Sequence, residues 1–182
     1  MSNWPESGGI LIDCNVFKHH WDKDPVFNGD GHVALLLASL VLKKTRLRID
    51  NEQVIRHEYH KFIIPLFKAG NQTGIEVELL RYWMEPQNQD VIDISAQKPL
   101  KQIILKIIHE PRERADRTYV CVSFCCGSPL ITNDLIHIVV GPPGEKKQGE
   151  RRTRLINAAK QHRHPSSEIL RSSEAHARIG EA

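Results

Sequence analysis

Four acidic residues stand where their carboxylates could share a divalent cation. Asp13 ends the apolar run of residues 10–12, and Asp134 follows the apolar pair at residues 130–131. Glu58 lies inside a segment with helical periodicity, and Asp116 lies at the start of another. Because gathered carboxylates repel one another, they need a cation, and hard oxygen ligands favour Mg²⁺ or Mn²⁺. These four acids are therefore the candidate catalytic and metal-binding residues.

Carboxylate-bound divalent ions suit the hydrolysis of a phosphodiester bond. That reaction needs an attacking water, stabilisation of charge on the phosphoryl oxygens and help for the leaving oxygen, and one or two ions can supply all three. The protein has to hold the ions and leave coordination positions open for the substrate. Acids scattered along the chain can do this from different elements, so they predict a metal-dependent phosphodiesterase.

The elements that must position these acids alternate between short apolar segments and helical patterns. Strands are predicted at residues 10–13, 45–49, 91–94, 130–132 and 136–140. Helices are predicted at residues 32–44, 75–84, 100–108, 114–124 and 151–161, and at residues 52–66 with Asp50 or Asn51 as the N-cap. This order predicts an α/β fold with three αβα layers and a mostly parallel central sheet. Right-handed crossovers would bring the carboxyl ends of the strands to one edge, where α/β proteins bind ligands.

Length and composition are those of an ordinary globular protein. The 182 residues suit one domain, expected at residues 1–144, followed by a tail at residues 145–182. The longest apolar run, residues 33–42, is too short to cross a membrane. Residues 1–9 contain no basic residue and precede no long apolar stretch, so no secretory signal is expected. Four cysteines without a disulfide-type spacing favour a cytoplasmic protein.

The net charge of +3 is unevenly distributed along the chain. Residues 141–182 hold nine Lys or Arg and five Asp or Glu, a balance of +4, so residues 1–140 carry −1. A basic stretch of this kind can bind a phosphate backbone by releasing counterions. The other interpretation is a solvated tail that binds nothing.

Together these segments resemble the PIN domain, the fold of many toxin–antitoxin ribonucleases and RNA-processing nucleases. The resemblance covers roughly residues 10–140 and is carried by residues 11–15, Glu58, and residues 111–117 and 130–134. The first acid follows the first strand in an Asp-x-Asn pattern, and the last lies in a Thr-x-Asp pattern. The departures are Cys14 where Thr is frequent, a long segment between the second and third acids, and the tail.

The resemblance implies a role for each matching residue. Asp13, Asp116 and Asp134 would be the core ligands of Mg²⁺ or Mn²⁺, and Glu58 would complete the set directly or through a water. The residues expected to orient the ligands or the attacking water are Asn15, Thr132 and Asn133. The substrate would be nucleic acid, with RNA favoured over DNA. An inhibitory antitoxin-like protein and a second copy of the chain are further candidate partners, and no membrane partner is expected.

Each acid also has an ordinary structural interpretation. Asp13 could be a turn residue or a helix cap, and Asp134 could be a cap as well. Asp116 could interact with the helix dipole, in which case Glu113, one turn earlier, could be the acid instead. Glu58 could simply face solvent. A PIN-like fold that has lost catalysis and serves as a binding or assembly module is the alternative function.

Basic and aromatic residues could contact a nucleic-acid strand. The candidates for phosphate contacts are Lys18, Arg117, Arg151 and Arg152. The aromatic residues that could stack on bases are Trp21, Tyr82 and Trp83, but packing is the favoured interpretation for each of them. Cys121 and Cys125, four residues apart on a predicted helix, favour packing over metal binding because no third and fourth ligands accompany them.

Overall fold

A computed structural model describes residues 4–5, 8–21, 31–68, 75–109, 113–133, 149–162 and 168–180. Within these residues the strands form one five-stranded sheet in the order β3-β2-β1-β4-β5, and every pairing is parallel. The strands are β1 (Gly9–Ile12), β2 (Arg46–Asp50), β3 (Gln89–Ile92), β4 (Leu130–Ile131) and β5 (Ile169–Leu170). The central strand is thus also the first strand of the chain.

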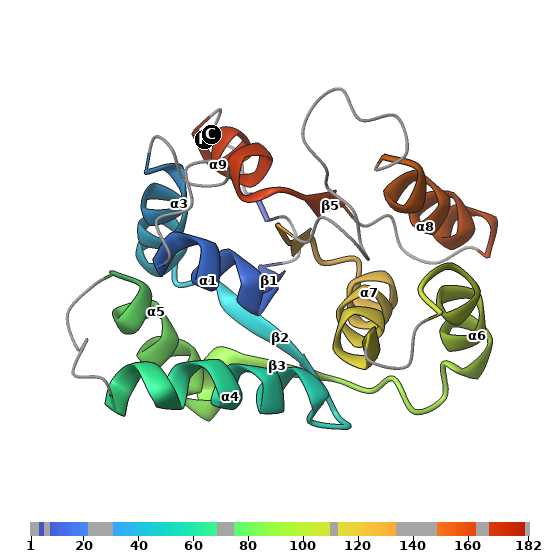
Figure 1. Cartoon of the computed structure of the whole chain (residues 1–182), viewed down its shortest axis with the longest axis horizontal. Helices are drawn as coiled ribbons and strands as arrows, with labels where there is room; N and C mark the ends of the chain where they lie inside the picture. The colour runs from blue at the N-terminus through green and yellow to red at the C-terminus, as the bar shows by residue number, and fades with distance from the viewer. Residues whose placement is uncertain are drawn as a thin grey trace.

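Helices cover both faces of this sheet (Figure 1). The helices are α1 (Cys14–Trp21), α3 (His32–Leu42), α4 (Val54–Lys68), α5 (Ile75–Met84), α6 (Lys98–Ile107), α7 (Arg114–Cys126), α8 (Gly149–Gln161), α9 (Ser172–Gly180) and the 3₁₀ helix η1 (Pro86–Asn88). On one face α3 packs against α5 and α9, and on the other α7 packs against α4 and α6. The predicted three-layer α/β fold with a parallel sheet is confirmed.

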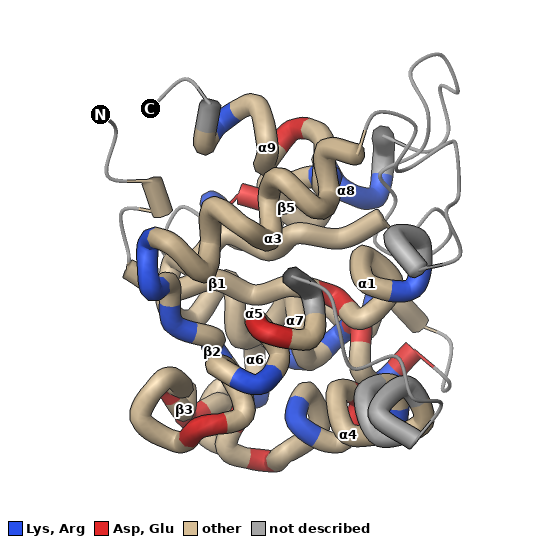
Figure 2. Tube along the Cα trace, turned by 90° about the vertical axis from the view of Figure 1, so that its left-hand side faces the viewer, with Lys and Arg blue, Asp and Glu red and all other residues tan. Residues whose placement is uncertain are grey.

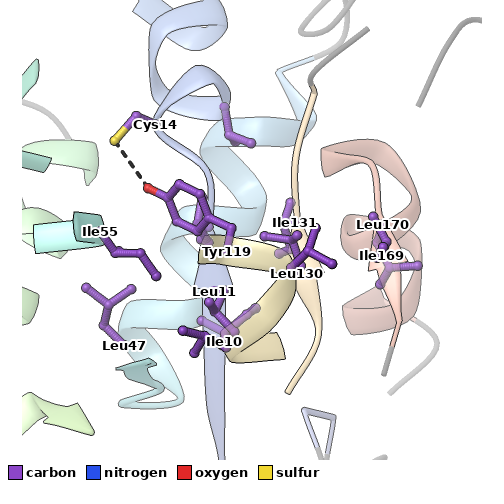
Figure 3. Packing of buried hydrophobic residues seen from close by; sticks show 14 of the residues in the cluster. Ile10, Leu11, Cys14, Leu47, Ile55, Tyr119, Leu130, Ile131, Ile169 and Leu170 are labelled. Atoms are coloured by element: carbon purple, nitrogen blue, oxygen red, sulfur yellow. Dashed lines mark hydrogen bonds between the residues drawn. The ribbon is translucent and has the colours of Figure 1, made fainter. Parts of the chain in front are cut away.

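The core strands are buried on both faces, which explains their continuous apolar sequences. Ile10, Leu11 and Ile12 of β1 are fully buried, and so are Leu130 and Ile131 of β4. Figure 3 shows the labelled side chains of β1 and β4 packed in one cluster with Leu47 of β2 and with Ile169 and Leu170 of β5. Strands of a parallel sheet covered by helices show this apolar run rather than an alternation.

Local signals set the ends of the two helices that matter most for the site. The carboxylate of Asp50 accepts hydrogen bonds from the backbone N–H groups of Val54 (2.9 Å) and Ile55 (2.8 Å), so the predicted cap of α4 is confirmed. α7 ends at Gly127, whose φ of 69° is the left-handed conformation that favours glycine. A turn of residues 127–129 then leads into β4. The first turn of α7 therefore lies at the edge where the strands have their carboxyl ends.

The C-terminal residues correct the prediction of a tail at residues 145–182. α8 matches the helix predicted at residues 151–161, but β5 pairs with β4 inside the central sheet. α9 packs against α3, so this segment belongs to the fold of residues 1–144 and is not an appendage. A two-residue strand has no periodicity of its own, and its pairing partner alone defines it. Residues 14–21, where the sequence analysis predicts neither a helix nor a strand, form α1. The strand predicted at residues 136–140 lies outside the described residues.

Charged residues are spread over several elements and are not confined to the C-terminal segment. Figure 2 shows Lys and Arg on the turn from α3 into β2 and on α8, and acidic residues on β3. Arg46 and Arg48 of β2 both pair with Asp90 of β3, the former at 2.6 Å. No helix in the described part of the chain has the length and apolar character needed to cross a membrane.

Candidate acidic site at the switch point of the sheet

The strand order creates a switch point between β1 and β4. From β1 the chain adds β2 and β3 on one side and then β4 and β5 on the other. In open parallel sheets, ligands bind in the crevice outside the carboxyl ends of the strands at such a point. Asp13 follows β1 directly, and Thr132 follows β4. We call this place, defined by Asp13, Asn15 and Thr132, the acidic edge.

Asp13 is held by three hydrogen bonds at this edge. Its Oδ1 accepts from the backbone N–H of Asn15 (3.1 Å), and its Oδ2 accepts from Asn15 Nδ2 (2.9 Å) and from the Thr132 hydroxyl (2.9 Å). The residue is only 6% exposed, so these donors offset part of the cost of burying a carboxylate. A carboxylate oxygen has two lone pairs, so an oxygen that accepts one hydrogen bond can also bind a cation.

Asn15 joins the ends of β1 and β4. Besides its bond to Asp13, its Nδ2 lies 3.3 Å from Thr132 Oγ1, and its Oδ1 accepts from the backbone N–H of Asn133 (2.9 Å). The structure thus brings Asn15 and Thr132 into contact with Asp13, as the sequence pattern predicts. Asn133 contributes through its backbone, because its side chain points toward the start of α9.

A buried chain of hydrogen bonds leads from Asn133 to two residues that the sequence did not indicate. Asn133 Oδ1 accepts from the backbone N–H (3.1 Å) and the hydroxyl (3.0 Å) of Ser172. Ser172 Oγ lies 3.0 Å from His32 Nε2. Since Ser172 has one hydroxyl proton and gives it to Asn133, the Nε2–H of His32 donates to Ser172. The partners are up to 140 residues apart, so no local motif could have revealed them.

Neutral aromatic and thiol groups form the inner wall of the acidic edge. The Tyr59 hydroxyl donates to the carbonyl of Ile12, and the Tyr119 hydroxyl lies 3.6 Å from Cys14 Sγ (Figure 3). Burial and then the charge of Asp13 raise the pKa of the Cys14 thiol, and Glu58 adds to the effect. Burial also raises the pKa of both tyrosines. Cys14 is therefore a protonated packing residue and not a nucleophile.

Glu58 and Asp116 approach the same edge from two other helices. Glu58 is half-buried on α4, and its charge acts on the Cys14 thiol. Asp116 is half-buried in the first turn of α7, three residues before Tyr119. Residues three apart share one side of a helix, so Asp116 lies on the side of α7 from which Tyr119 contacts Cys14. Glu113, the alternative acid, is 2% exposed and lies deeper than Asp116.

The described residues do not by themselves complete a metal site. Among them, no three His, Cys, Asp or Glu residues lie close enough together to hold a metal ion. Asp13, Glu58 and Asp116 therefore share an edge without forming such a group, and Asp134 lies outside the described residues. The chemistry of these donors suits Mg²⁺ or Mn²⁺.

The candidate nucleic-acid contacts differ in how freely they could bind a strand. Lys18 is exposed on α1. Arg117 donates to the carbonyl of Ile108 (3.3 Å). Arg152 Nη1 donates to both carboxylate oxygens of Glu174 (3.1 and 3.0 Å) and so ties α8 to α9. Arg151 is half-buried on the same helix.

The aromatic candidates have structural roles where they can be described. Trp83 is fully buried, and its Nε1 donates to the carbonyl of Thr45 (2.8 Å). The hydroxyl of Tyr82 donates to the carbonyl of Lys44 (3.0 Å). The packing interpretation that the sequence favours for Trp83 is therefore confirmed, because burial removes both faces of its ring from any ligand. The side chain of Trp21 lies outside the described residues.

Comparison with known proteins finds no relative for this chain. No family model matches it, and no curated protein and no solved structure does so either. Any functional conclusion must therefore come from the chemistry and the geometry of its own residues.

Proposed function

We propose that this protein is a metal-dependent phosphodiesterase, a nuclease of the PIN-domain type with RNA as the favoured substrate. The observation that supports this most directly is the Asp13 carboxylate, held by Asn15 and Thr132 at the switch point of a parallel sheet. A buried carboxylate with three donors has a fixed orientation, which is what an ion ligand needs. Glu58 and Asp116 at the same edge, with Asp134 two residues beyond Thr132, would supply further oxygen ligands.

Each group has a defined part in the proposed reaction. A bound Mg²⁺ or Mn²⁺ would stabilise charge on the phosphoryl oxygens and lower the pKa of a coordinated water. Asn15 and Thr132 hold Asp13 in place, since both donate to it. The phenols and the thiol behind Asp13 keep water away from its inner side. Lys18, which is exposed on α1, would contact the phosphate backbone of the substrate.

The cellular setting belongs to the same proposal. A cytoplasmic ribonuclease of this type would need control, and an inhibitory antitoxin-like protein is the candidate for that role. Growth arrest on expression, relieved by a neighbouring gene product, would support it.

Cleavage assays with the purified full-length chain test the proposal. Single- and double-stranded RNA and DNA are incubated with Mn²⁺, Mg²⁺ or EDTA. We expect ion-dependent cleavage of RNA, and we expect Asp13→Asn to reduce kcat by about 10²–10³-fold or more, as for the loss of one key electrostatic group in other active sites. Circular dichroism checks that this variant is folded.

Asp93→Asn is the matched control. Asp93 is an exposed carboxylate just beyond β3 that accepts hydrogen bonds from Ser95 and Asn51. Its substitution therefore tests whether the loss of any carboxylate at this edge lowers the rate of cleavage. Its variant should retain activity. Undiminished cleavage in Asp13→Asn, or cleavage that persists in EDTA, would contradict the proposal.

The second candidate is a nucleic-acid-binding or assembly module without catalysis. It is favoured by one observation, that the acids within the described residues do not form a group able to hold a metal. Titration with Mn²⁺ separates the two candidates. Unchanged RNA affinity without any ion binding would favour the module, whereas ion binding that depends on Asp13 would favour the nuclease.

A further inference from the structure

A hollow lies between α6 and α7, two helices that stand side by side in Figure 1. Its volume is about 230 Å³. Cationic side chains line it, namely Lys101 of α6 and Arg114 and Arg117 of α7, together with the carboxylate of Glu52. Ile104 and Leu105 of α6 supply an apolar wall. We call it the cationic hollow.

The cationic hollow and the acidic edge lie on opposite faces of α7. Arg114, Arg117 and Cys121 line the hollow, and their spacing of three and four residues places them on one face. Asp116 and Tyr119 occupy the other face, because each residue turns the helix by about 100°. Tyr119 contacts Cys14 on that side. A helix is roughly 10 Å across, so the two places are separate sites.

The charges of the hollow suit a doubly charged anion. Lys101 and Arg114 both face Glu52, the former in close contact and the latter at 3.9 Å. Among the described residues that line the hollow, three cations face one carboxylate. A phosphate monoester, which carries about −1.5 to −2 at pH 7, is an anion that such a lining attracts. The Arg114 side chain is 70% exposed, so it can turn from Glu52 toward a ligand at little cost.

The apolar wall indicates that the ligand is more than a bare anion. Leu105 is 47% exposed beside these cations, whereas Ile104 is buried behind it. The exposed leucine can pack against a ring of the ligand, and the neighbouring guanidinium groups can bind its phosphate. Typical small-molecule sites measure about 300–1,000 Å³, so this smaller hollow suits a small ligand.

We propose that the cationic hollow binds a small organic phosphate of about the size of a nucleoside monophosphate. The phosphate lies against Arg114 and Arg117, and the apolar part lies against Leu105. This binding does not require the nuclease activity proposed above, because none of the acids of the acidic edge lines the hollow.

Calorimetric titration of the full-length chain tests the proposal, with adenosine 5′-monophosphate as the probe. Low salt limits screening, and EDTA keeps divalent ions out of the acidic edge. We expect saturable binding of the monophosphate. Adenosine and inorganic phosphate should each bind at least about tenfold more weakly, since each lacks one of the two contacts. Comparable affinity for inorganic phosphate alone would overturn the proposal.

Substitutions on exposed positions locate the binding. Arg114→Ala removes a charge-assisted hydrogen bond, and Leu105→Asp places a negative charge on the apolar wall, so each should weaken binding by about tenfold or more. The matched control is Arg81→Ala, an exposed arginine on α5 outside the hollow, which should bind as the unchanged protein does.

Asp13→Asn separates this proposal from the nuclease proposal. Monophosphate binding in EDTA should be the same with and without this substitution, even if the variant has lost all cleavage. If Asp13→Asn abolishes monophosphate binding while Arg114→Ala leaves it unchanged, the ligand binds at the acidic edge and the cationic hollow is not its site. Absence of saturable binding to the unchanged protein at millimolar probe would overturn the proposal directly.

Discussion

The two faces of α7 differ in what holds their residues in place. On the face toward the sheet, Tyr119 is 1% exposed and contacts Cys14, which lies 105 residues earlier in the chain. On the face toward α6, the Arg114 side chain is 70% exposed and its neighbours are ion pairs at the surface. Ion pairs at the surface contribute little to stability, whereas buried side chains packed in the core contribute much. The inner face is thus organised before any ligand arrives, and the outer face can adapt to one.

The largest expected difference between the two faces is in stability. Tyr119→Ala removes a fully buried ring and should lower the free energy of unfolding by about 3–5 kcal/mol, as for other large aromatic residues in cores. Arg114→Ala, on the outer face of the same helix, should change it by less than about 1 kcal/mol, because this side chain is 70% exposed. Urea unfolding followed by circular dichroism measures both. Similar losses of unfolding free energy for the two variants would mean that the two faces contribute equally to stability.

A smaller effect is expected when the support of Asp13 is weakened without removing the acid. Thr132→Val deletes the hydroxyl that donates to Asp13 and keeps the shape of the side chain. We expect kcat/KM for metal-dependent cleavage to fall by about 10–100-fold, the usual effect of losing a residue that orients a metal ligand.

Thr45→Val provides the comparison for this variant. Thr45 is also buried, but it precedes β2 and so lies at the opposite edge of the sheet from Asp13. Its variant should cleave at the normal rate. If both valine variants lose activity equally, the loss reflects general destabilisation and the hydroxyl of Thr132 has no specific role.

The smallest effect concerns the reactivity of the thiols on the two faces. A hydrogen bond from Cys121 lowers the pKa of Cys125, and the charge of Lys101 acts in the same direction. A lowered pKa means more thiolate at a given pH, so Cys125 should react with iodoacetamide at pH 8 at least about tenfold faster than Cys14. Burial and the charge of Asp13 keep Cys14 protonated at this pH.

Mass spectrometry of the alkylated peptides gives the order of labelling. Cys121 should stay unmodified while Cys125 reacts, because the hydrogen bond between them raises the pKa of the Cys121 thiol. Labelling of Cys14 as fast as Cys125 would show that the inner face opens readily to solvent.

Local patterns predicted those parts of the fold whose stabilising contacts are close in sequence. The apolar run at residues 10–12, the cap at Asp50 and the helix before β4 all appear close to their predicted places. β5 and α1 were missed for the opposite reason. β5 exists because Leu130 and Ile131 offer it a partner, and α1 carries histidines and a lysine that give no clear apolar periodicity.

The contacts of the acidic edge also fall into those that are close in sequence and those that are far apart. The pairing of Asp13 with Asn15 could be predicted because the two residues are neighbours in the chain, and their contact with Thr132 followed from the strand ends. The support that Ser172 and His32 give to Asn133 could not be predicted, since it joins segments up to 140 residues apart. The cationic hollow was missed too, because it needs the spacing between α6 and α7.

The amino-acid sequence alone determined the class of fold, the buried strands and the acids worth testing. Periodicity and capping depend on residues that are close together in the chain, so they are visible in the sequence itself. The tertiary structure alone decided that Asp13 lies at a switch point and that Arg114 and Arg117 of α7 meet Lys101 of α6 in one hollow. It also placed residues 168–170 in the central sheet. These outcomes depend on how whole elements pack, and packing joins groups that the chain order keeps far apart.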